Sequence, residues 1–156
     1  MWGFGLRRRQ VFGDETWRLA LARDRVGLWR AASLLQNGRM EYDAHRAKAF
    51  ARALDGNVEA ALTELNAGWT EDWPFPAAYA ADIARVRYLA GDYESSLGAL
   101  RLAVAGTDRL DPQVAHLAAA VVACAPRLRL RAVRVVLAGG SPWQRLRNAA
   151  LAAAAR

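Results

Sequence analysis

The sequence predicts an all-α protein built from antiparallel helix pairs, and two observations lead to this prediction. The first is an internal repeat, because residues 49–65 and 84–100 share seven of seventeen positions at a spacing of 35 residues. The second is that apolar residues recur at helical spacing, whereas strand-like alternation is confined to the start of 127–137. A repeat of this length is typical of stacked helix pairs, since one pair cannot bury its apolar face alone.

Each copy of the repeat is predicted to form a helix, a tight turn and a second helix. Gly56 and Gly91 lie where the first helix must end, because glycine adopts a positive φ there without strain. Asn57 and Asp92 follow as caps of the second helix. The identical positions are Ala49/Ala84, Arg52/Arg87, Leu54/Leu89, Gly56/Gly91, Glu59/Glu94, Leu62/Leu97 and Leu65/Leu100.

The turn and second helix resemble a known family. The stretch "YLAGDYESSLGALRLAVAG", residues 88–106, resembles the tetratricopeptide repeat (TPR), whose signature there runs Gly, Asp or Asn, Tyr, two variable residues, Ala and Leu. The matching residues are Gly91, Asp92, Tyr93, Leu97 and Ala103, with Ser96 in place of the Ala, and in the earlier copy Gly56, Asn57, Ala61, Leu62 and Gly68. The first helices depart from the family, because His45 and Ala80 stand where it has a bulky aromatic residue.

The TPR resemblance implies a short right-handed solenoid of about seven or eight helices with a concave surface that binds peptides or proteins. We expect a flexible N-terminal arm, 1–13, followed by a single helical domain, 14–156. The segments of that domain are a leading helix 14–37, a repeat 42–68, a repeat 77–106, a degenerate repeat 111–138 and a C-terminal helix 142–155. Gly27 is the residue at which the leading helix is expected to bend or split.

The C-terminal segments carry weaker patterns than the two repeats. Pro126 falls where the turn glycine of a third copy belongs, so the repeat 111–138 is degenerate. The segment 127–137 begins like a strand, but we favour a helix because a lone strand has nothing to pair with here. Ser141-Pro142 is a helix start, and the helix that follows places four apolar residues on one side. These residues are Trp143, Leu146, Ala150 and Ala153.

Charge is distributed unevenly along the chain, although the net charge is +7. Residues 1–40 hold eight arginines and three acidic residues, and residues 41–111 hold seven basic and twelve acidic residues. Residues 112–156 hold seven arginines and no acidic residue. An acidic middle therefore lies between two basic ends, which points to partners recognised in part by charge.

A catalytic site is not indicated by the sequence. His45 and His116 are the two histidines, and neither has a nucleophile or a carboxylate at a recognised spacing. Cys124 is the one cysteine, so an intrachain disulfide and a cysteine-rich zinc site are both excluded. We therefore expect no catalytic residue, no metal site and no cofactor, and we expect a cytoplasmic protein without a transmembrane segment.

Two candidate binding surfaces follow from the predicted architecture. If the first helix of each pair lines the concave face, the residues exposed there to a partner peptide are Arg46, Phe50, Arg85, Tyr88 and His116. The second surface is an arginine cluster that suits phosphate groups, formed by Arg127, Arg129, Arg131, Arg134, Arg145 and Arg147. This cluster has three interpretations: a solvated helix face, a nucleic-acid site, or a protein contact that includes a head-to-tail dimer with the acidic middle of a second copy.

The expected function is protein–protein interaction without catalysis, through the concave face or through the apolar, basic C-terminal helices. The alternative is a nucleic-acid-associated protein that uses the arginine-rich C-terminal region. The partner is a protein or peptide whose identity the sequence does not give, and a homo-oligomer remains open. The N-terminal stretch "MWGFGLRRRQVF" is either an arm or a membrane-surface segment, and its two glycines favour the arm.

Overall fold

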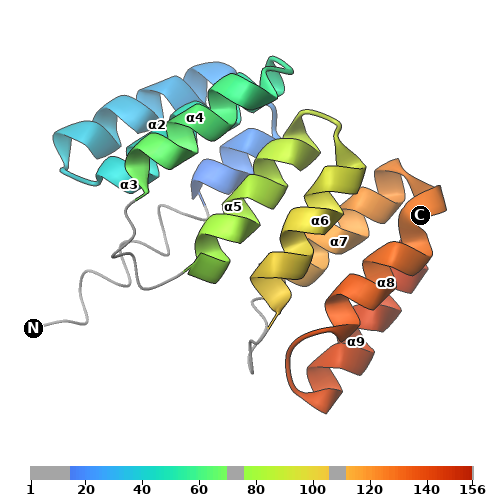
Figure 1. Cartoon of the computed structure of the whole chain (residues 1–156). Helices are drawn as coiled ribbons and strands as arrows, with labels where there is room; N and C mark the ends of the chain where they lie inside the picture. Colours follow the sequence, from blue (N-terminus) through green and yellow to red (C-terminus); the bar gives the residue numbers. More distant parts are fainter. Residues whose placement is uncertain (1–14, 70–75, 106–111, 156) are drawn as a thin grey trace, which may run out of the picture. The chain divides into compact units, whose positions relative to one another are not determined.

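The structure, a computed structural model, describes residues 15–69, 76–105 and 112–155. Every regular element within these ranges is helical, and the helices pack in sequential pairs, which confirms the all-α class (Figure 1). The chain divides into two compact units, Met1–Asp72 and Trp73–Arg156, and each is described by itself. The predicted arm, 1–13, lies outside the described residues.

The leading segment of the N-terminal unit is split into two helices, and the split lies before Gly27, where the sequence predicted a bend or split. Residues 15–21 are helical, and α2 then spans Arg25–Asn37. Arg23 adopts a φ of 55° between them, and the Asp24 carboxylate accepts a 2.8 Å hydrogen bond from the N–H of Gly27. The break lies before Gly27, because Asp24 caps a new helix there.

The first predicted repeat is a helix pair, α3 (Glu41–Leu54) and α4 (Val58–Gly68). Gly56 has a φ of 76° in the turn, as predicted, and the side chain of Asn57 accepts a 3.0 Å hydrogen bond from the N–H of Ala60. Glycine has no Cβ to strain this left-handed conformation, so the helix ends there at little cost. α3 also packs along α2, so it lies between two helices of its own unit.

The second predicted repeat is the pair α5 (Pro76–Leu89) and α6 (Tyr93–Val104) in the C-terminal unit. Gly91 has a φ of 82° and the Asp92 carboxylate caps α6, which repeats the turn geometry of the first pair. Ser96 is fully buried, and its hydroxyl donates a 2.8 Å hydrogen bond to a backbone carbonyl of α5. A small residue at this position lets the two helices approach closely.

The rest of the C-terminal unit is also helical, and its elements are α7 (Pro112–Cys124), the short 3₁₀ helix η1 (Pro126–Leu128), α8 (Arg129–Leu137) and α9 (Pro142–Ala154). The segment 127–137 is therefore helix rather than strand, which confirms the prediction. α9 begins at Pro142 with a capping box in which Ser141 and Gln144 bond each other's backbone N–H groups.

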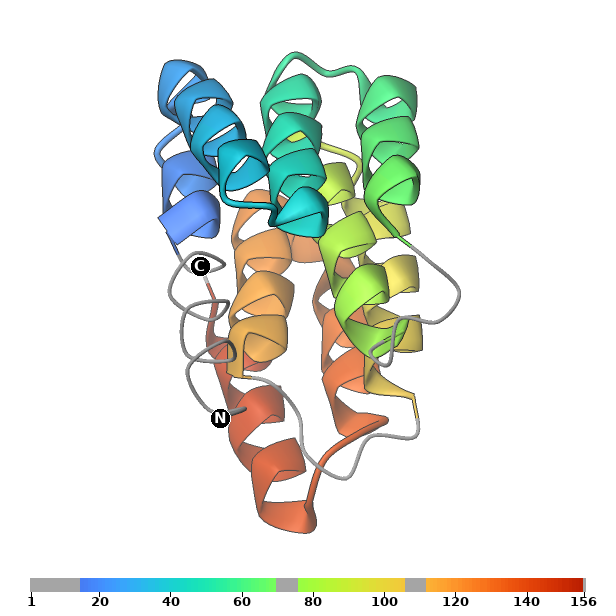
Figure 2. The ribbon, with the colours of Figure 1, turned by 90° about the vertical axis from the view of Figure 1, so that its left-hand side faces the viewer.

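The packing order of the C-terminal unit positions the candidate sites. α5 packs on α6, α7 packs on both of them, and α8 packs on α6 and α7. α9 follows last and packs on both α7 and α8 (Figure 2). The interior is formed mainly by small and branched apolar side chains, and the α7–α9 part of it includes Val121, Val122, Ala132, Val136 and Ala152.

Candidate functional site

Two of the five predicted concave-face residues are arginines that bind carboxylates of their own helices. The Arg46 guanidinium lies 2.9 Å from the Asp43 carboxylate, and the Arg85 guanidinium lies 2.7 Å from the Asp82 carboxylate. Both arginine side chains are only 11% exposed. Arg85 also donates to the Gln113 side chain, which links α5 to α7. The expectation that these arginines are exposed to a partner's acidic groups is wrong, because carboxylates three residues earlier already pair with them.

Phe50 is also buried, so the expectation that it is exposed is wrong. Its side chain has no exposed area, and its ring packs edge-on against Trp17 at a centroid distance of 5.6 Å. The sequence argument assigned one face of α3 to a partner. In the structure α2, α4 and Trp17 all contact α3, so few of its positions reach solvent.

The other two predicted concave-face residues keep access to solvent. Tyr88 is half-buried, with its hydroxyl 3.9 Å from the thiol of Cys124 and its ring 5.8 Å from the ring of Tyr93. His116 lies on the exposed side of α7. Of the predicted concave-face residues, these two, both in the C-terminal unit, are the ones that keep access to solvent.

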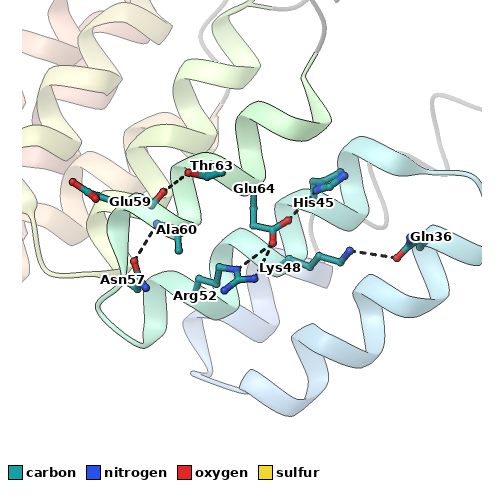
Figure 3. A network of polar contacts seen from close by, with 9 residues as sticks. All are labelled: Gln36, His45, Lys48, Arg52, Asn57, Glu59, Ala60, Thr63 and Glu64. Carbon is teal, nitrogen blue, oxygen red and sulfur yellow. Dashed lines mark hydrogen bonds and ion pairs between the residues drawn. The ribbon is translucent and has the colours of Figure 1, made fainter.

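A polar network between α3 and α4 is a feature that the sequence did not single out (Figure 3). The Glu64 carboxylate of α4 lies 3.0 Å from Nδ1 of His45 and 3.0 Å from a terminal nitrogen of Arg52, both on α3. The guanidinium of Arg52 also lies 5.8 Å from the ring centroid of Trp29 on α2. The network ties three helices of the N-terminal unit together, and its chemistry is that of a structural ion-pair cluster.

The ionisation of Glu64 is coupled to this network. Burial acts to raise the pKa of Glu64, and the hydrogen bonds from His45 and Arg52 outweigh it, so the pKa lies below its ordinary value. A depressed folded-state pKa means that the carboxylate stabilises the fold above its unfolded-state pKa. That contribution disappears as the pH falls through the folded-state pKa.

Replacing Glu64 by glutamine is expected to lower the free energy of unfolding at pH 7 by about 1–2 kcal/mol, because charge-assisted hydrogen bonds are lost. The difference in unfolding free energy between the variant and the wild type should shrink below about pH 4. There the wild-type carboxyl becomes protonated, so both side chains are neutral. Urea titrations at both pH values check this, with Glu59→Gln on the exposed side of α4 as the control. A difference that stays the same at both pH values would contradict it.

The six predicted phosphate-binding arginines are all exposed in the structure. Three of them have contacts within the unit: Arg129 donates to the carbonyl of Ala155, Arg131 to the Glu94 carboxylate and Arg145 to the carbonyl of Gly140. The other three are Arg127, Arg134 and Arg147. The described part of the chain from Pro112 onward contains no acidic residue, so this region is uniformly basic.

α9 has two apolar faces, and one of them is turned to solvent. Asn148 and Ala152 are buried against the unit, whereas Trp143 is 76% exposed and Leu146 is 66% exposed. Ala150 and Ala153 follow on the same exposed side at helical spacing. The sequence grouped the four exposed residues correctly. The sequence did not show which face of α9 points outward. Alanines lie on both faces, and the polar residue Asn148 lies on the buried face, where an apolar residue would be expected.

Two classes of site are absent from the described residues. No group of three or more His, Cys, Asp and Glu side chains within them is arranged to hold a metal ion. No helix among the described segments is long and apolar enough to cross a membrane.

Comparison of the chain with protein-family models, with curated proteins and with solved structures gives no match, so its own residues alone support a functional assignment.

Proposed function

We propose that this chain is a non-catalytic helical-repeat module, similar to TPR proteins, that binds a partner protein. Support for the repeat comes from the two turns, where Gly56 and Gly91 share a left-handed conformation and Asn57 and Asp92 cap the next helix. Further support comes from the C-terminal unit, where α5 to α8 pack in the order expected of two consecutive helix pairs. A TPR-like solenoid is the arrangement that we propose for these pairs.

The observation that carries the proposed function is the exposed apolar face of α9. A helix on the surface of a globular unit ordinarily buries its apolar stripe and turns a polar face to solvent. Here Trp143 and Leu146 occupy that face and are mostly exposed. Tryptophan is among the residues that contribute most to protein interfaces, and a cluster of exposed apolar residues marks an interaction site.

The predicted concave face has a smaller role in this proposal. Phe50 is buried, and Arg46 and Arg85 are mostly buried and paired with carboxylates of their own helices, so none of the three serves as an exposed contact. Tyr88 and His116 are the residues of that set that a partner can still reach, and they form a secondary surface in the C-terminal unit.

Nucleic-acid binding is the second candidate function, and the observation that favours it is the exposure of all six C-terminal arginines. Arginines bind phosphate oxygens without sequence preference, and such binding weakens steeply with salt. If this candidate is right, replacing Arg127, Arg131 and Arg134 by glutamine removes most of the binding to a duplex.

The proposed function is tested by placing a photo-crosslinking amino acid, benzoylphenylalanine, at position 143 or at the control position 66 in the source cell. Trp143 lies on the exposed face of α9, and Asn66 is an exposed residue of α4. We expect protease-sensitive, nuclease-resistant adducts at 143 that are absent at 66. Equal adducts at both positions, or none at 143, would overturn the proposal, and a nuclease-sensitive adduct would favour the second candidate.

A further inference from the structure

The α9 docking face, defined as Trp143, Leu146, Ala150 and Ala153, has a shape and a charge that specify its partner. Resting on the proposed function, we propose that it takes one acidic amphipathic helix of another protein, laid along α9. The four residues follow at intervals of three, four and three, so they form a straight stripe about 15 Å long on a helix that rises 1.5 Å per residue. A stripe of this length matches about three turns of a partner helix.

The sizes of the side chains along the stripe define where the partner fits. Trp143 and Leu146 are large and occupy the N-terminal half, whereas Ala150 and Ala153 are small and occupy the C-terminal half. Helices pack by placing large side chains of one opposite small side chains of the other. The partner helix is therefore expected to present large apolar residues over the alanines and small ones over Trp143.

The charge beside the stripe selects an acidic partner. Arg147 is exposed and follows Trp143 by four residues and precedes Ala150 by three, so it borders the stripe on the surface of α9. Arg127 and Arg134 of the neighbouring η1–α8 segment are exposed as well. No acidic residue of the described chain from Pro112 onward offsets them. Aspartates or glutamates at the margin of the partner helix would meet this positive potential, and lysines would be repelled.

The same charges disfavour a second copy as the occupant. Two antiparallel α9 helices would satisfy the size pattern, since Trp143 would lie opposite Ala153 and Leu146 opposite Ala150. Such a dimer would bring the two Arg147 side chains together beside the interface, and residues 112–155 contribute no acidic side chain to separate them. An acidic helix from another protein has the complementary charge and meets the same apolar stripe.

The proposal is tested with labelled peptides, using fluorescence anisotropy on the full chain. The first probe is a stapled 18-residue helix with leucines at i and i+3, alanines at i+7 and i+10, and glutamates on its margins. The second probe is identical except that lysines replace the glutamates. We expect the glutamate peptide to bind at least about tenfold more tightly, with Leu146→Glu weakening it at least about tenfold and Arg147→Gln about threefold. The matched control Leu34→Glu, at an exposed leucine of α2, should change nothing.

Five outcomes would overturn the proposal. Equal binding of the two peptides would show that charge does not select the partner. Binding that survives Leu146→Glu would show that the peptide does not bind at the α9 docking face. A dimer of the chain alone, detected by sedimentation and dissociated by Leu146→Glu, identifies a second copy as the occupant. Binding of a 20-base-pair duplex or of phosphatidylserine vesicles in place of both peptides identifies a different class of ligand. If neither peptide binds while position 143 still crosslinks to a protein, the acidic-helix proposal fails and the proposed function stands.

Discussion

Replacing Phe50 by alanine is expected to lower the free energy of unfolding of the N-terminal unit by about 3–5 kcal/mol. The ring is fully buried in α3 and contacts Trp17 edge-on, so the truncation removes apolar burial, an aromatic contact and the atoms that fill the space between helices. Because α3 packs between α2 and α4, its neighbours cannot close the cavity without moving a helix. Chemical denaturation followed by far-UV circular dichroism measures the loss.

The control for Phe50 is Leu34→Ala on α2, whose side chain is mostly exposed. Its truncation is expected to change the free energy of unfolding by less than about 0.5 kcal/mol. Phe50→Leu should fall between the two, because most of the volume is retained. If Phe50→Ala were as mild as Leu34→Ala and instead abolished crosslinking to a partner, Phe50 would be an exposed contact, as the sequence suggested.

Local features of the fold could be predicted from the sequence because they depend on a few adjacent residues. The turns at Gly56 and Gly91 were predicted with their positive φ and their caps, since only the glycine and the next residue decide them. The helical state of 127–137 was predicted as well, because a strand needs a partner that the chain does not offer there.

The sequence predicted a break in the leading helix but placed it at the wrong residue. Gly27 is a common helix breaker, so it was the expected bend. The structure places the break four residues earlier, at Arg23, where a non-glycine residue adopts a positive φ. The stronger signal was Asp24, because an aspartate with a free backbone N–H three residues later can start a new helix.

The candidate site was predicted less well because burial is a property of the whole unit. The sequence assigned Arg46 and Arg85 to an exposed face by position within the repeat. Each has an aspartate three residues earlier, and this spacing was the available signal that the charge is satisfied within the helix. The outward direction of Trp143 depends on which face of α9 meets α7 and α8, and an alanine-rich helix offers two apolar faces from which to choose.

Replacing Asp82 by asparagine is expected to lower the free energy of unfolding of the C-terminal unit by about 3–5 kcal/mol. The Asp82 side chain is 2% exposed and lies 2.7 Å from the Arg85 guanidinium, so the substitution leaves a positive charge in the interior without its counterion. Arg85 also holds the side chain of Gln113, so its displacement would loosen the contact between α5 and α7. The measurement is a urea titration of each variant at pH 7.

The matched control is Glu15→Gln, because Glu15 and Arg18 form an ion pair at the same spacing on a helix surface. Both of these side chains are exposed, and water solvates the charge that remains, so the control should leave the denaturation midpoint unchanged. The double variant Asp82→Leu with Arg85→Met removes both charges and should recover more than half of the loss. A midpoint for Asp82→Asn equal to that of Glu15→Gln would mean that Arg85 reaches solvent and remains available to a partner's carboxylate.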